Sequence, residues 1–100
     1  MRIVWSKKAN YTFYNIQYYL EQYWTLAILQ KFIKDSLHII NLLENNPELG
    51  KYNAELECRE IVLSKQVKLY YEINEDDIIL IAFSNNRQKP LSFLNLQNFR

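Results

Sequence analysis

Side chains that can bind a phosphate and act on it gather in the second half of the sequence. The candidates are Arg59, Lys65, Lys68, Tyr71 and Arg87. A patch of arginine, lysine and tyrosine, without histidine or metal, can hold a phosphodiester and stabilise the charge that develops on it during cleavage. The same patch can instead contact acidic groups on a protein, and the plainest alternative is a set of scattered solubilising charges. The residues alone leave all three interpretations open.

Other kinds of chemistry lack the residues that they need. The sequence has one histidine, His38, and one cysteine, Cys58, so a Cys/His zinc site cannot form. His38 also falls on the outward face of an expected helix, away from any catalytic partner. The single glycine, Gly50, excludes the glycine-rich loops that cradle nucleotide phosphates. The acidic run at 75–77 is typical of a solvated turn, so we expect no metal and no cofactor.

Length and composition indicate one small domain that spans residues 1–100. The chain has 100 residues, of which 49% are hydrophobic and 15% aromatic, enough for a core without disulfides. Arginine and lysine total 12 against 11 acidic residues, and a net charge of +1 gives no bulk attraction to nucleic acid. No run approaches the ~20 apolar residues that span a membrane, and a lone cysteine fits a reducing compartment. We therefore expect a cytoplasmic protein without a membrane partner.

The first half of the chain is expected to fold as a strand followed by two helices. Residues 3–5 form a short β-branched and aromatic run, and Ser6 can cap the helix that follows. Apolar residues then recur at steps of three and four over residues 8–24. Thr25 can cap a second helix with the same spacing, which must end near Asn46. Because almost no loop separates them, the two helices should form an antiparallel hairpin.

The second half switches to the two-residue period of strands. After a connecting loop over residues 46–55, alternating patterns predict strands at 58–63 and 67–74, and a continuous apolar run predicts a third at 78–83. The last of these is apolar on both faces, which favours a place in the middle of the sheet. The expected fold is α+β: an N-terminal strand, an antiparallel two-helix hairpin and a three-stranded antiparallel meander. The tail over 91–100 is apolar and has no clear period.

Five tyrosines crowd the first expected helix and cover more of it than its apolar stripe. They are Tyr11, Tyr14, Tyr18, Tyr19 and Tyr23. Some of them must therefore be exposed or must meet something beyond the hairpin. A surface that binds a partner and a tyrosine-rich edge of the core are both consistent with this pattern.

Several short motifs occur in the order found in one known superfamily. They are Trp5 and Ala9 at the opening of the hairpin, Asn46-Pro47-Glu48-Leu49-Gly50, Arg59 on a strand, Leu69-Tyr70-Tyr71-Glu72-Ile73, and Asn86-Arg87-Gln88-Lys89-Pro90. Together with the order of the elements, over about residues 3–90, they resemble the RelE/ParE toxins of bacterial type II toxin–antitoxin systems. The fold of that superfamily is a helical hairpin on a twisted antiparallel sheet, which agrees with the fold that periodicity predicts.

The resemblance implies a growth-inhibiting toxin that a cognate antitoxin protein neutralises in a hetero-oligomer. RelE-like members are metal-independent endonucleases that cut mRNA on the ribosome. The positions that match such an enzyme are Arg59, Lys65, Lys68, Tyr71 and Arg87. Nuclease members are commonly strongly basic, whereas this chain is near neutral and places several glutamates around Arg59, at positions 55, 57 and 60.

ParE-like members, which inhibit DNA gyrase, share the long helical hairpin and the Asn-Pro-x-x-Gly loop more closely. The turn from Arg87 to Pro90 also looks like their C-terminal motif, whereas the apolar tail departs from both patterns. The sequence therefore favours a ParE-like toxin with gyrase as its target, and the ribosome-dependent endonuclease is the alternative. A non-toxic interaction domain on the same scaffold is a third interpretation.

Overall fold

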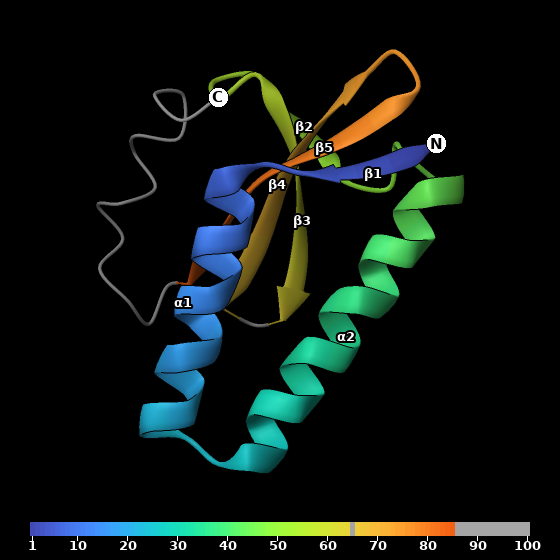
Figure 1. Cartoon of the computed structure of the whole chain (residues 1–100). Helices are drawn as coiled ribbons and strands as arrows, with labels where there is room; N and C mark the ends of the chain where they lie inside the picture. Colours follow the sequence, from blue (N-terminus) through green and yellow to red (C-terminus); the bar gives the residue numbers. More distant parts are fainter. Residues whose placement is uncertain (65, 86–100) are drawn as a thin grey trace.

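Two helices pack on one face of a five-stranded sheet (Figure 1). The structure is a computed structural model, and it describes residues 1–64 and 66–85. In chain order the elements are β1 (Arg2–Trp5), α1 (Lys7–Tyr23), α2 (Leu26–Asn45), β2 (Lys51–Asn53), β3 (Cys58–Ser64), β4 (Val67–Asn74) and β5 (Asp77–Asn85). The α+β fold expected from the sequence is confirmed. The tail at 91–100 lies outside the described residues.

The helical hairpin forms because a capping residue starts each helix and a very short connection separates them. Ser6 Oγ accepts a hydrogen bond from Ala9 N at 2.9 Å, and Thr25 Oγ1 accepts one from Ile28 N at 3.2 Å. These bonds satisfy first-turn N–H groups that have no partner within the helix. Both expected caps and the hairpin are therefore confirmed. The hairpin buries a stripe that includes Ile16, Leu20, Phe32, Ile40 and Leu43.

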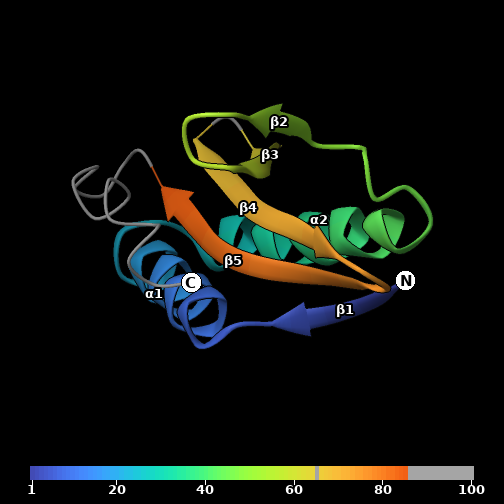
Figure 2. The same cartoon turned by 90° about the horizontal axis from the view of Figure 1, so that it is seen from above.

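The sheet has the strand order β1-β5-β4-β3-β2, in which β3, β4 and β5 form the expected antiparallel meander. The prediction that the strand at 78–83 lies in the middle is wrong. β5 is second from one edge of the sheet, because β1 pairs with it in parallel, Ile3 beside Ile78, on the side opposite β4. The central strand is β4. Figure 2 shows β1 running along the outer side of β5.

The predicted loop at 46–55 contains a short strand, so the loop prediction is wrong at Lys51–Asn53. These residues form β2, which pairs antiparallel with β3 and places Tyr52 opposite Arg59. The strand is too short to show an apolar alternation, and its pairing with β3 defines it rather than a pattern of its own. The loop proper is therefore limited to residues 46–50 on the α2 side of β2.

The main core lies between the hairpin and the sheet and is centred on aromatic rings. The Phe13 ring centroid is 4.8 Å from that of Phe83, 5.3 Å from Trp5 and 5.4 Å from Phe32, within the range of favourable aromatic pairs. A smaller cluster lies on the other face of the sheet and consists of Cys58, Tyr70, Ile81 and Ala82, with Leu56 packed against it. β5 is apolar on both faces, as expected, because it contributes to both clusters.

Helix α1 continues along the edge of β5 where β1 ends at Trp5. Ser6 Oγ donates a hydrogen bond to Ile81 O at 2.9 Å. Further along α1, Thr12 Oγ1 accepts a hydrogen bond from Phe83 N, also at 2.9 Å. Side chains of the helix therefore satisfy backbone groups that an additional strand would otherwise pair with. This edge of the sheet is closed, and the helix is fixed relative to it.

Candidate functional site

Arg59 and Tyr71 lie side by side at the end of the sheet that meets the α2–β2 loop. They are opposite each other on β3 and β4, on the face that the helices cover. The Tyr71 side chain is fully buried, and its hydroxyl donates to Pro47 O and accepts from Gly50 N, both at 2.8 Å. Arg59 Nη1 donates to Gly50 O, also at 2.8 Å. We call this arrangement of Arg59, Tyr71, Pro47 and Gly50 the loop clamp.

The loop clamp explains the Asn-Pro-x-x-Gly motif. The Asn46 backbone N–H and side-chain amide both donate to Leu42 O at 3.0 Å, which ends α2. Pro47 supplies the carbonyl that Tyr71 holds. A Cβ on Gly50 would come within 2.7 Å of Tyr71 Cε1 and Oη, too close for any side chain unless the clamp opens. Each fixed residue of the motif therefore has a structural role.

Burial makes the Tyr71 hydroxyl a hydrogen-bond donor rather than a base. Removal from water raises the pKa of Tyr71 above its ordinary value of 10.0, and the negative charge of Glu48 acts in the same direction. The hydrogen bond from Gly50 N–H and the positive charge of Arg59 oppose this rise in pKa without cancelling it. Tyr71 therefore keeps its proton at neutral pH, where it donates to Pro47 O.

Lys68 lies on the opposite face of the sheet from Arg59 and Tyr71. Side chains of a strand alternate between its faces, and Lys68 is an odd number of positions from Tyr71 on β4. Its Nζ is 3.7 Å from Glu60 Oε1 on β3. The expectation that neighbouring strands bring the candidates together holds for Arg59 and Tyr71 and not for Lys68. The other two candidates, Lys65 and Arg87, lie outside the described residues.

On the face of the sheet away from the helices, a polar group lies beside the smaller apolar cluster. Glu60 is held between Lys68 and Asn53, whose Nδ2 donates to Glu60 Oε2 at 3.3 Å. The Lys68 and Glu60 side chains are 41% and 22% exposed, so solvent weakens their attraction. Tyr70 and Cys58 beside them are almost completely buried. A lysine that is already paired with a carboxylate is a poor start for a phosphate-binding patch.

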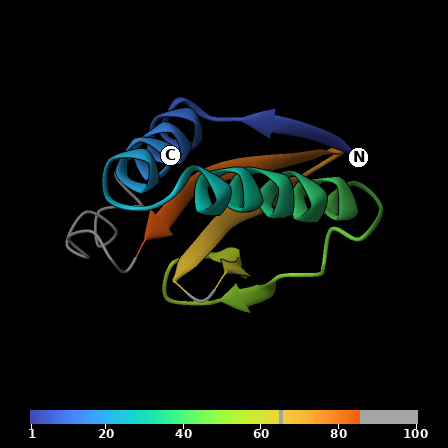
Figure 3. The same cartoon turned by 90° about the horizontal axis from the view of Figure 1, so that it is seen from below.

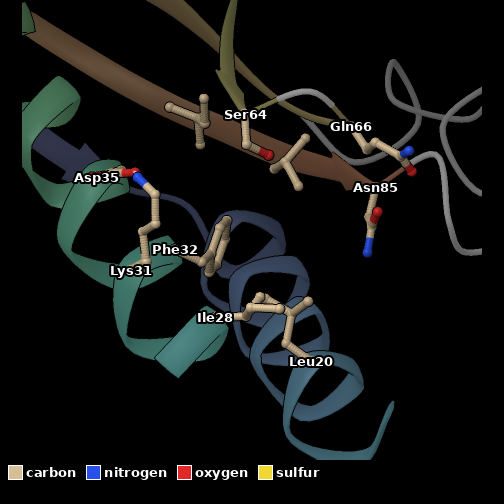
Figure 4. Close-up of a pocket in the computed structure, with 10 residues that line it drawn as sticks. Leu20, Ile28, Lys31, Phe32, Asp35, Ser64, Gln66 and Asn85 are labelled. Atoms are coloured by element: carbon tan, nitrogen blue, oxygen red, sulfur yellow. The ribbon is translucent and has the colours of Figure 1, made fainter. Parts of the chain in front are cut away.

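A cavity of about 420 Å³ opens between the helical hairpin and the sheet (Figure 4). Its apolar walls come from both layers, namely Leu20, Ile28, Phe32, Leu63 and Val67. One side of its rim carries the ion pair of Lys31 and Asp35, whose Nζ and Oδ2 atoms are 2.7 Å apart, and Ser64, Gln66 and Asn85 line the other side. No sequence motif indicates this cavity, because its lining comes from five elements that are far apart in the chain. Its lining suits an apolar group with a polar edge.

The prediction that His38 faces outward is confirmed, and Cys58 belongs to the smaller apolar cluster. His38 is exposed on α2, and Cys58 is buried with 3% of its surface accessible. Within residues 1–64 and 66–85, no three His, Cys, Asp or Glu side chains gather in a group that can hold a metal ion. In this part of the chain, neither helix has both the length and the hydrophobicity needed to cross a membrane.

The N-terminal strand, the helical hairpin and the antiparallel meander form a fold similar to that of a bacterial toxin of known structure. Among solved structures, the chain is similar to a copper-bound mutant toxin from Helicobacter pylori, with a TM-score of 0.56 and 16% sequence identity. The similarity covers 87% of this chain and 96% of that toxin, and at this identity it shows the fold alone. No family model and no curated protein matches the sequence.

Proposed function

We propose that this protein is the toxin of a bacterial type II toxin–antitoxin pair and that it inhibits DNA gyrase in the cytoplasm. A cognate antitoxin protein neutralises it by forming a hetero-oligomer. The fold shared with the Helicobacter pylori toxin supports the general assignment to toxins. The long helical hairpin and the Asn-Pro-x-x-Gly loop, through which the sequence resembles ParE-like toxins, support gyrase as the target.

The loop clamp is the observation that favours inhibition by binding over catalysis. A RelE-like endonuclease needs Arg59 and Tyr71 within reach of a phosphate. In this protein the Tyr71 side chain has no accessible surface, and its hydroxyl is engaged by Pro47 and Gly50. Arg59 donates to the same loop. An inhibitor that acts by contact with gyrase needs no catalytic residue of its own, so this arrangement is compatible with it.

Purified protein added separately to gyrase and to translating ribosomes distinguishes the two targets. We expect loss of supercoiling and double-strand breaks in the DNA, while the mRNA remains intact. Cleavage of mRNA with normal supercoiling would contradict the gyrase proposal and support the endonuclease, acting through Lys65, Lys68 and Arg87. No effect in either assay, together with normal growth on induced expression, would identify a non-toxic interaction domain.

The antitoxin part of the proposal is tested by the product of the adjacent gene. We expect this product to co-purify with the chain and to restore growth when both are expressed. If the chain arrests growth and the adjacent product neither binds it nor relieves the arrest, the assignment to a toxin–antitoxin pair is wrong.

The variant Arg59→Ala separates a structural from a catalytic role for this arginine. We expect it to lower the free energy of unfolding by about 1.5–3 kcal/mol, because Gly50 O loses a charged donor. Inhibition of gyrase should fall only in proportion to the folded fraction, measured by circular dichroism. Lys51→Ala, on the exposed side of the neighbouring strand β2, is the control and should change neither quantity. A stable but inactive Arg59→Ala protein would contradict the clamp interpretation.

A further inference from the structure

Helix α1 carries a row of tyrosines on the side that faces solvent. Tyr11, Tyr14 and Tyr18 are 61%, 64% and 55% exposed, although burial of aromatic rings is strongly favourable. Lys7 precedes this row by one turn, and Glu21 follows it by one turn; both are exposed. Positions 7, 11, 14, 18 and 21 alternate in steps of four and three, the spacing of a coiled-coil contact line. We call these five residues the tyrosine seam.

The tyrosine seam is separate from the side of α1 that holds the fold together. Helix α1 buries Ala9, Thr12, Ile16 and Leu20 toward the core, and these residues occupy other positions in the helical turn. Figure 3 shows α1 at the outer side of the molecule, beside α2 rather than enclosed by it. Exposed aromatic residues on a surface with few charges are typical of protein interfaces. Among the described residues, no other part of the protein packs over the seam.

The charges of α1 stand only at its two ends. Lys7 and Lys8 begin the helix, Glu21 lies near its end, and the other residues of α1 are uncharged. Lys8 Nζ lies 5.7 Å from the centre of the Tyr11 ring. Among residues 1–64 and 66–85, neither Lys7 nor Glu21 forms an ion pair. The seam thus has a positive end, an aromatic centre and a negative end.

This order of charges is complementary to itself when the helix is reversed. Lys7 and Glu21 are equally distant from Tyr14, about 10 Å on either side at 1.5 Å per residue. We propose that a second copy of this chain docks on the tyrosine seam, with the two α1 helices antiparallel and Tyr14 of each copy at the two-fold axis. Lys7 of each copy then faces Glu21 of the other, and Tyr11 packs beside Tyr18 of the other copy.

The antiparallel arrangement is preferred over the parallel one because of these charges. In a parallel pair, Lys7 would face Lys7 and Glu21 would face Glu21, which is unfavourable, and the helix dipoles would also be aligned. A two-fold antiparallel pair instead uses the same patch on both copies, as closed dimers do. A contact limited to one helix is small, so we expect a dissociation constant on the order of micromolar.

Sedimentation equilibrium of the purified full chain over a micromolar concentration range tests the dimer. We expect the wild type to dimerise and Tyr14→Arg, which places two positive charges at the axis, to remain monomeric. Lys7→Glu and Glu21→Lys should each weaken dimerisation about tenfold, because each makes two like-charge pairs. The double variant K7E/E21K restores opposite charges and should return the dissociation constant to within about threefold of the wild type.

Two control variants carry the same changes away from the seam. Tyr52→Arg replaces a 54% exposed tyrosine on β2, and Lys34→Glu reverses an exposed charge on α2; both should dimerise normally. Circular dichroism checks that every variant is folded. A monomeric wild type, or a double variant no better than the single ones, overturns the proposal. Binding of single-stranded RNA by a monomer, lost when Tyr14 is replaced by alanine, would overturn it in favour of a base-stacking surface.

Discussion

At the scale of the single residue, Tyr71 fixes the loop between α2 and β2 to the sheet. Its ring fills the space beside Gly50, and its hydroxyl joins two backbone groups that lie 21 and 24 positions earlier in the chain. These contacts hold the end of α2 against the centre of the sheet. The contribution of this residue should therefore appear in the stability of the fold.

The variant Tyr71→Phe removes the hydroxyl and keeps the ring. We expect the free energy of unfolding to fall by about 1–3 kcal/mol, because Gly50 N–H stays buried without its acceptor. Denaturant unfolding followed by circular dichroism measures this change. Tyr52→Phe, at an exposed tyrosine, is the matched control and should differ from the wild type by less than about 0.5 kcal/mol.

The same variant tests the raised pKa of Tyr71. The unfolded chain releases this proton near pH 10, whereas the folded protein keeps it to a higher pH. The stabilisation by protonated Tyr71 is therefore complete below pH 10 and is lost as the pH rises from there toward the folded-state pKa. The difference in the free energy of unfolding between wild type and Tyr71→Phe should be constant at neutral pH and shrink above about pH 10. A gap that widens with pH would contradict this account.

The sequence included Arg59 and Tyr71 among five candidates, without showing that these two lie together or what they hold. Strand periodicity places each of these side chains on the apolar face of its own strand, because the alternation is read from neighbouring positions in the sequence. The partners Pro47 and Gly50 are far away in the sequence, and no local pattern reveals that they occupy the hydroxyl. The odd spacing of Lys68 and Tyr71 does carry a signal, since it places them on opposite faces once β4 is recognised.

At the scale of elements, the hairpin was predictable and the edges of the sheet were not. Ser6 and Thr25 are local cap signals, and the apolar spacing between them defines both helices. The positions of β1 and β2 depend on pairing with distant strands, and the central place of β4 follows only from that pairing. The attachment of α1 to β5 through Thr12 and Ser6 likewise depends on contacts between distant residues.

The variant Thr12→Val tests the attachment of α1 to β5. Valine has the shape of threonine without the acceptor, so Phe83 N–H would be buried without a partner. We expect a loss of about 1–3 kcal/mol in the free energy of unfolding and faster hydrogen exchange at the Phe83 amide. The comparison is Thr25→Val, which removes an exposed cap and should cost about 1 kcal/mol or less. Equal losses in the two variants would argue against the attachment.

At the scale of the whole molecule, the proposed contacts use different surfaces. The tyrosine seam shares no residue with the loop clamp or with the lining of the cavity. A dimer through α1 therefore leaves the cavity residues free to contact the proposed antitoxin or target. The proposed self-association and the proposed binding of an antitoxin can then be tested separately, by variants of α1 in one case and of the cavity lining in the other.

The pairing of β1 with β5 sets when the fold can be completed during synthesis. β1 is synthesised first, yet its partners are residues 77–80, so the sheet stays incomplete until most of the chain has been made. Until then α1 also lacks Ile81 and Phe83, the backbone groups that anchor it. At 5–20 residues per second, synthesis lasts on the order of ten seconds. A nascent chain, or one that ends before residue 77, therefore cannot complete the sheet, and any activity that depends on the fold begins only after residues 77–85 have been made.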